Sequence, residues 1–65
     1  MTKEEADKIA EIVAKVDGAC SVCVRDATLE LMANFPDHDW KARIKAIAIR
    51  DNEYWAKEVD EWNDT

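Results

Sequence analysis

Apolar residues in the first quarter of the chain recur at steps of three and four, the spacing of one face of an α-helix. Thr2 and Glu5 form a capping box in front of this stripe, and Asp17-Gly18 ends it, with Gly18 suited to a left-handed C-terminal position. The pattern predicts a helix over about residues 3–16. Its apolar positions are Ala6, Ile9, Ala10, Val13 and Val16, with Ile12 at the margin.

The segment Ala19–Phe35 is the most apolar part of the chain. A helix that is apolar over most of its circumference is usually packed on two sides, so we expect this helix to be the central one. Asp17 or Ser21 is expected to cap its start, and Pro36 to end it, because proline disfavours the helical region for the preceding residue. Its main stripe is Cys20, Cys23, Val24, Ala27, Leu31 and Phe35.

A turn at residues 36–39 precedes a third helix, with Asp37 or Asp39 as the expected N-cap. Its apolar stripe can run unbroken to Asn63, through Trp40, Ile44, Ile47, Ala48, Trp55, Val59 and Trp62. The charges favour a break, because the bases come first and the acids last, which opposes the helix dipole. We therefore expect the helix to break at Arg50/Asp51, with Asp51 or Asn52 capping the piece that follows.

These patterns predict an all-α fold in a single small domain, residues 1–65. It is a compact bundle of three helices, the third long and broken near Asp51 into a fourth. A chain of this size buries only about 60% of the surface that its unfolded form exposes. No apolar run is long enough for a membrane span. The N-terminus lacks the apolar core of a secretory signal, so we expect a cytoplasmic protein with reduced thiols.

The formal net charge of −6 is concentrated in the last fifteen residues. This segment holds two of the three tryptophans, Trp55 and Trp62, and the only tyrosine, Tyr54. Its single base is Lys57, and its six acids are Asp51, Glu53, Glu58, Asp60, Glu61 and Asp64. A negative surface with aromatic anchors is suited to a cationic partner. The plainer alternative is that the charge keeps a small domain soluble.

The composition excludes several classes of function. A single histidine, a single glycine and the lack of a phosphate-binding loop argue against an enzyme and against a cofactor-binding protein, and we expect neither. The negative charge argues against direct binding to nucleic acid, whose phosphates require cationic contacts. It permits the reverse case, in which an acidic protein occupies a cationic groove that normally holds nucleic acid.

Cys20 and Cys23 have the CxxC spacing found in redox and zinc proteins. No strand precedes them, as a redox motif of the common type would require. As zinc ligands they need two more partners, for which only His38 with Asp37 or Asp39 is available in the chain. We favour a third interpretation, in which two small apolar residues one helical turn apart fill the core. His38 itself is expected to be a solvated turn residue.

The tryptophans admit two interpretations. Trp40 is expected to pack beneath the second helix, and Trp55 and Trp62 are expected to cap the core of the bundle. If the third helix were continuous, its end would overhang the shorter helices. Trp55 and Trp62 would then be exposed anchors for a partner, or for a second copy of the chain in a homodimer.

In size, charge and helical content the chain resembles the small phage-encoded anti-defence proteins, such as anti-CRISPR inhibitors. The resemblance implies binding to a basic, nucleic-acid-binding surface of a host protein and blocking it. On this hypothesis the partner-binding residues are Asp51, Glu53, Tyr54, Trp55, Glu58, Asp60, Glu61 and Trp62. The alternatives are a thiol or zinc module built on Cys20 and Cys23, and a homodimeric accessory protein.

Overall fold

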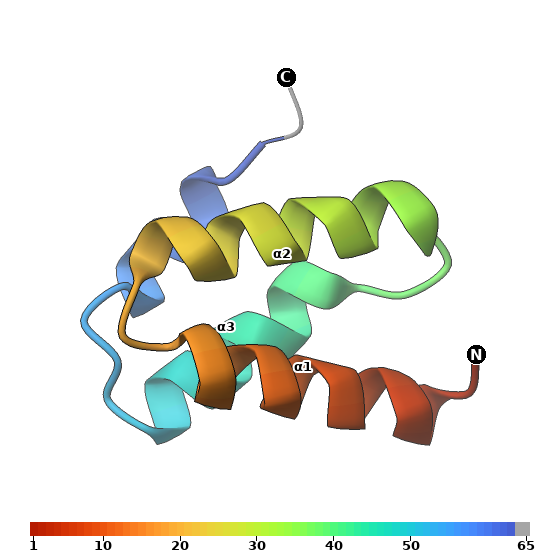
Figure 1. The fold of residues 1–65 in the computed structure, drawn as a ribbon, viewed down its shortest axis with the longest axis horizontal. Coiled ribbons are helices and arrows are strands. Elements are labelled where there is room, and N and C mark those ends of the chain that lie inside the picture. The colour runs from red at the N-terminus through yellow and green to blue at the C-terminus, as the bar shows by residue number, and fades with distance from the viewer. Residues whose placement is uncertain (64–65) are drawn as a thin grey trace.

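The computed structural model describes residues 1–63, and over that range it contains helices and no strand, as the sequence predicts. The elements are α1 (Lys3–Asp17), α2 (Ser21–Asn34), α3 (Trp40–Arg50) and a short 3₁₀-helix, η1 (Ala56–Glu61). In Figure 1, α1 and α2 run in opposite directions, α3 packs against both, and the C-terminal segment folds back towards the start of α2. Within this range no helix is both long and apolar enough to cross a bilayer.

The start of α1 is the predicted capping box. The Thr2 hydroxyl accepts a hydrogen bond from the Glu5 N–H at 3.1 Å, and the Glu5 carboxylate accepts from the Thr2 N–H at 2.8 Å. The predicted end is wrong in detail, because Gly18 keeps a right-handed conformation with φ −61°. Gly18 is buried, so what it provides is close approach: a Cβ there would collide with the Ala14 carbonyl oxygen.

Helix α2 begins and packs differently from the expectation. Its N-cap is Cys20, whose sulfur accepts from the Cys23 N–H, and neither Asp17 nor Ser21 fills that position. It ends as predicted before Pro36. Only Val24 and Thr28 are fully buried in it, so the prediction that α2 is the central helix is wrong.

The helix that contributes most to the core is α3. Asp39 caps it by accepting from the Ala42 N–H at 3.1 Å, which is one of the two caps that the sequence allowed. Trp40 is buried as expected, and its indole N–H donates to the Phe35 carbonyl at 2.9 Å. The other buried residues of α3 are Ile44, Ile47 and Ala48.

The predicted break between Arg50 and Asp51 is confirmed. Asp51 closes α3 with its N–H on the Ile47 carbonyl at 2.9 Å, and Asn52 takes a left-handed conformation with φ 55°. The expected caps of the next helix are wrong. The 3₁₀-helix starts only at Ala56, with Trp55 in the N-cap position and no side-chain cap.

The C-terminal segment completes the core instead of extending beyond it. Val59, Trp55 and Trp62 lie among the buried residues of all three α-helices. The core cluster is Ala10, Val24, Ile44, Ile47, Ala48, Trp55, Val59 and Trp62.

Candidate functional site

Trp55 and Trp62 are core residues. Their side chains are 0% and 5% exposed, and their rings stack with centroids 5.9 Å apart. The Trp55 indole N–H donates to the Gly18 carbonyl at 2.7 Å and to the Glu53 carboxylate at 3.1 Å. The hypothesis that these two tryptophans are exposed anchors is therefore wrong, and the alternative, that they belong to the core of the bundle, is confirmed. The hypothesis of a homodimer that pairs exposed Trp55 and Trp62 side chains loses its structural basis for the same reason.

The period of η1 sorts its side chains onto three sides. In a 3₁₀-helix, residues three apart lie directly above one another. Val59 and Trp62 form the buried row together with the partly buried Ala56. Lys57 and Asp60 form a second row, and Glu58 and Glu61 form a third, in which every member is an exposed carboxylate.

The Asp60 row is tied to α3. The Asp60 carboxylate accepts from the Lys45 ammonium at 2.6 Å, and its main-chain carbonyl accepts from Lys41 at 3.2 Å. The hydrogen bond from Lys45 lowers the pKa of Asp60 below its ordinary value. By folding back after Asp51, the acidic segment therefore lies against the cations of the helix before it.

Asp51 is neutralised in a similar way at the end of α3. The Arg50 guanidinium donates to Asp51 at 2.9 and 3.0 Å, and also to both carboxylate oxygens of Glu11 on α1. These bonds lower the pKa of both carboxyl groups. Asp51 thus joins an ion-pair network between α1 and α3, and its charge is largely compensated.

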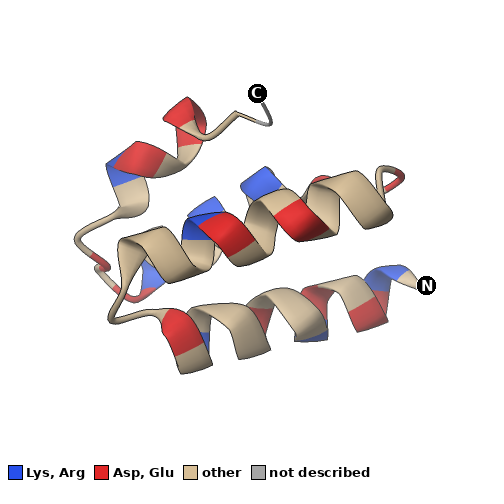
Figure 2. Ribbon diagram, turned by 45° about the horizontal axis from the view of Figure 1, so that its top comes forward, with Lys and Arg blue, Asp and Glu red and all other residues tan. Residues whose placement is uncertain are grey.

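Glu58 and Glu61 are different, since no ion pair or side-chain hydrogen bond holds either carboxylate within residues 1–63. Both line a groove of about 530 Å³ between α2 and η1. The remaining lining residues are Arg25, Leu29, Trp62 and Asn63. Arg25 is paired with Asp26 at 3.3 Å, so the groove keeps a negative balance. In Figure 2 the C-terminal segment carries acidic positions next to a single basic one, and further acidic positions lie along α1 and α2.

Two other predicted site residues serve the fold. Glu53 is half-buried through its bond to Trp55. Tyr54 is 69% exposed, yet its hydroxyl accepts from the Ser21 N–H at 3.2 Å and donates to the Ala19 carbonyl at 3.5 Å. The side chain of Tyr54 is therefore largely exposed, while its hydroxyl ties the segment to the start of α2. Asp64 lies outside the described residues.

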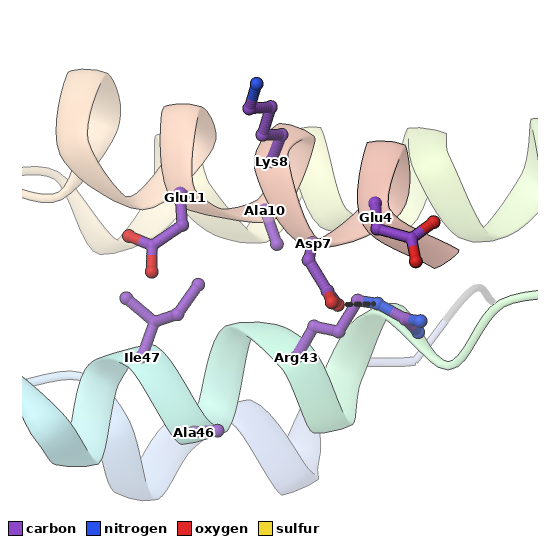
Figure 3. A pocket seen from close by; sticks show the side chains of 8 residues that line it. All are labelled: Glu4, Asp7, Lys8, Ala10, Glu11, Arg43, Ala46 and Ile47. Carbon is purple, nitrogen blue, oxygen red and sulfur yellow. Dashed lines mark hydrogen bonds and ion pairs between the residues drawn. The ribbon is translucent and has the colours of Figure 1, made fainter. Parts of the chain in front are cut away.

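The sequence interpretation missed a second groove, between α1 and α3. It has a volume of about 500 Å³, and Figure 3 shows its apolar floor of Ala10 and Ile47 and its acidic rim. The rim acids are Glu4, Asp7 and Glu11, and their spacing along one helical face was the available signal. Asp7 is paired with Arg43 at 2.9 Å and Glu11 with Arg50, so most of this rim is already compensated.

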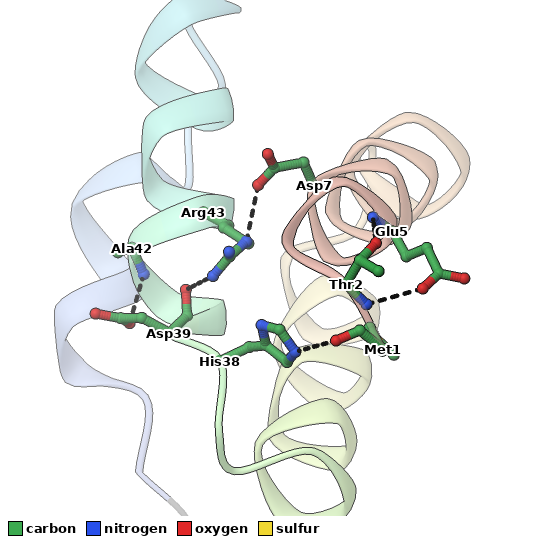
Figure 4. A network of polar contacts seen from close by, with 8 residues as sticks. All are labelled: Met1, Thr2, Glu5, Asp7, His38, Asp39, Ala42 and Arg43. Atoms are coloured by element: carbon green, nitrogen blue, oxygen red, sulfur yellow. Dashed lines mark hydrogen bonds and ion pairs between the residues drawn. The ribbon is translucent and has the colours of Figure 1, made fainter.

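His38, which follows the C-terminal end of α2, contacts Met1, just before the N-terminal end of α1. Its Nε2 atom lies 3.2 Å from the Met1 carbonyl oxygen, and Figure 4 shows this contact beside the Asp7–Arg43 pair. Its ring also lies 5.7 Å from that of Trp40, so it is half-buried and contacts other residues instead of being the expected solvated turn residue.

The candidate zinc ligands are not brought together. Cys20 and Cys23 lie at the start of α2, whereas His38 follows its far end, about 20 Å away for a helix of this length. Across residues 1–63 no cluster of three or more histidine, cysteine or acidic side chains is arranged to hold a metal ion. The favoured interpretation of the thiols is also wrong, because Cys23 is exposed and Cys20 only half-buried.

The chain matches no protein-family model, no curated protein and no solved structure.

Proposed function

We propose that this chain is a small acidic interaction protein that binds a cationic, nucleic-acid-binding surface of a partner protein and blocks it. Small phage-encoded anti-defence inhibitors, which the chain resembles in size and charge, act on their hosts in this general way. The proposed role is binding and not catalysis, and it calls for no cofactor. Its proposed contact surface is the outer side of the C-terminal segment.

The observation that carries the proposal is the uncompensated pair Glu58 and Glu61. They stack in one row of η1, so their charges repel each other, and a cation placed between them relieves that repulsion. An arginine suits such a pair, because its planar guanidinium donates to two carboxylates at once. Two further acids of the segment, Asp51 and Asp60, already have cations within the chain, and the Glu53 carboxylate accepts from the Trp55 indole.

The rigidity of this segment supports the same role. Trp55, Val59 and Trp62 fix η1 in the core, so the backbone that carries its carboxylates is held in place before any partner arrives. A preorganised surface loses less conformational entropy on binding. The exposed ring of Tyr54 extends the surface with an aromatic contact, in place of the two buried indoles.

The test begins with capture of a partner from a lysate of the source cells at low and high salt. A labelled nucleic acid bound to that partner is then titrated with the chain. The wild type is expected to displace the nucleic acid, and Glu58→Lys/Glu61→Lys to do so at least about tenfold less well, since like charges at an interface cost several kcal/mol.

The matched control is Glu30→Lys/Asp37→Lys, which changes the net charge equally at exposed positions outside both grooves. It is expected to retain displacement. Equal loss in both variants would mean that overall charge and not a local surface is responsible. Equal retention would remove Glu58 and Glu61 from the interface.

A further inference from the structure

The start of α2 brings together two thiols in unequal environments. Cys20 is the N-cap, and its sulfur accepts from the Cys23 N–H at 3.2 Å. The N-terminal end of a helix favours negative charge, because its first N–H groups are free to donate and the helix dipole is positive there. No acidic residue occupies the first turn of α2 to compete for that end.

The second thiol is one helical turn further on. Hydrogen bonds from the Cys23 thiol and backbone lower the pKa of Cys20, and the same thiol contact raises the pKa of Cys23. The acids Asp17 and Asp26 oppose ionisation from nearby without reversing this order. The two groups therefore differ as an attacking and a resolving thiol differ.

The C-terminal segment holds this turn in place. The Tyr54 hydroxyl accepts from the Ser21 N–H, and the Trp55 indole donates to the Gly18 carbonyl. The backbone on both sides of Cys20 is thus fixed by residues more than thirty positions away. The Cys20 sulfur accepts from the Cys23 N–H at 3.2 Å, so the Cys20 side chain folds over the first turn of α2 towards Cys23. A disulfide joins Cβ atoms about 3.5–4.5 Å apart, so its formation is expected to adjust the backbone at this N-cap.

We propose that Cys20 and Cys23 form a reactive dithiol that is oxidised by small-molecule disulfides such as oxidised glutathione. The Cys20 thiolate attacks one sulfur of the disulfide, forming a mixed disulfide and releasing one thiolate of the reagent. Cys23, after losing its proton to solvent, attacks the Cys20 sulfur. This step forms the Cys20–Cys23 disulfide and releases the second thiolate. Two thiols are oxidised, and one disulfide is reduced to two thiols.

The site is accessible for such a reaction. Cys23 is exposed, Cys20 is partly exposed, and the neighbouring Val22 is 51% exposed. Oxidation removes the sulfur of Cys20 as an anionic acceptor for the Cys23 N–H, so the first turn of α2 loses part of its cap. The proposal is independent of the acidic surface, since neither Glu58 nor Glu61 takes part in it.

The test uses the reduced 65-residue chain and oxidised glutathione, with acid quenching, alkylation of free thiols and intact-mass measurement. The wild type is expected to lose two hydrogens and accumulate no mixed disulfide. Cys23→Ser is expected to stop at one glutathione on Cys20. Cys20→Ser is expected to react several-fold more slowly at neutral pH, and serine is itself a good N-cap, so this variant keeps its helix.

A second readout separates reactivity from structure. The pH midpoint for alkylation of Cys20 in Cys23→Ser is expected to lie below that of Cys23 in Cys20→Ser. Equal rates and equal midpoints for the two single variants would overturn the proposal. So would a mixed disulfide that persists in the wild type, since Cys23 would then fail to resolve it.

Discussion

Trp62 illustrates why one residue type supports opposite hypotheses. An indole at the end of a short chain is an interface anchor if its helix overhangs, and a core residue if the chain turns back. The sequence places Trp62 seven positions after Trp55 on a helical stripe, but the stripe does not report whether the chain reverses between Trp40 and Trp62. The reversal depends on Asn52, and the core that receives Trp62 is built by residues from three other elements.

Trp62→Ala is expected to lower the free energy of unfolding by about 3–5 kcal/mol, because it removes a large buried side chain from a close-packed core. In a domain of this size each kcal/mol corresponds to about 4–8 °C in Tm, so thermal unfolding monitored by circular dichroism will show the loss. Val16→Ala, at a position that is 73% exposed, is the control and is expected to change little. An unchanged Tm for Trp62→Ala would show that Trp62 is not a buried core residue.

At the scale of the element, local sequence signals predicted several helix boundaries but not which helix lies at the centre of the bundle. The capping box of α1 and the Asp39 cap of α3 follow from side chains within four residues, and both are confirmed. The break after Arg50 follows from the order of bases and acids along the helix and is also confirmed. The left-handed end of α1 and the N-caps expected for α2 and for the last helix are wrong. The role of α2 is not local. Its apolar composition predicts a central helix, yet α3 takes that place, because the C-terminal segment packs against α3. The side chains of Cys23 and Phe35 on the α2 side therefore stay exposed.

The candidate site follows the same division. Composition alone located the acidic segment, but which of its acids are free depends on the 3₁₀ period of η1 and on the cations of α3. With a period of three, Glu61 lies directly above Glu58 and Asp60 is turned about 120° from both, whereas with a period of 3.6 residues Glu61 is turned about 60° from Glu58. The thiol pair was visible as a spacing, and its helix-capping geometry was not.

The break after α3 can be tested at Asn52. Its left-handed φ of 55° is unfavourable for most residues and free for glycine. Asn52→Gly is therefore expected to be more stable than Asn52→Ala by about 1 kcal/mol in urea denaturation. In a continuous helix the order reverses, because alanine is favoured over glycine by about the same amount. A more stable alanine variant would contradict the break.

At the scale of the whole molecule, ion pairs join elements that are far apart in sequence. Glu11 and Asp51 meet at Arg50, and Asp60 meets Lys45, so the pKa of each of these carboxyl groups is lowered on folding. A carboxyl group with a lowered folded pKa stabilises the fold above its ordinary pKa. That stabilisation is lost as the pH falls through the lower, folded value.

The melting temperature is therefore expected to be nearly constant from pH 7 to about pH 5. It should decrease once the pH drops below the ordinary pKa values, which are 4.5 for glutamate and 3.8 for aspartate. Because the groups are exposed, the drop should be a few degrees and should shrink at high salt. Lys45→Met is expected to remove part of it. A Tm that rises on acidification would show that repulsion among the acids outweighs these pairs.

The central claim is that the row of Glu58 and Glu61 on η1 is the surface that meets a cationic partner. The most direct measurement is to titrate the isotope-labelled chain with the captured partner and follow each backbone amide by NMR. The proposal predicts that the perturbed amides gather on η1 and on the facing turn of α2 around Arg25 and Leu29. Perturbations confined to the groove between α1 and α3, with the amides of Glu58 and Glu61 unchanged, would contradict it.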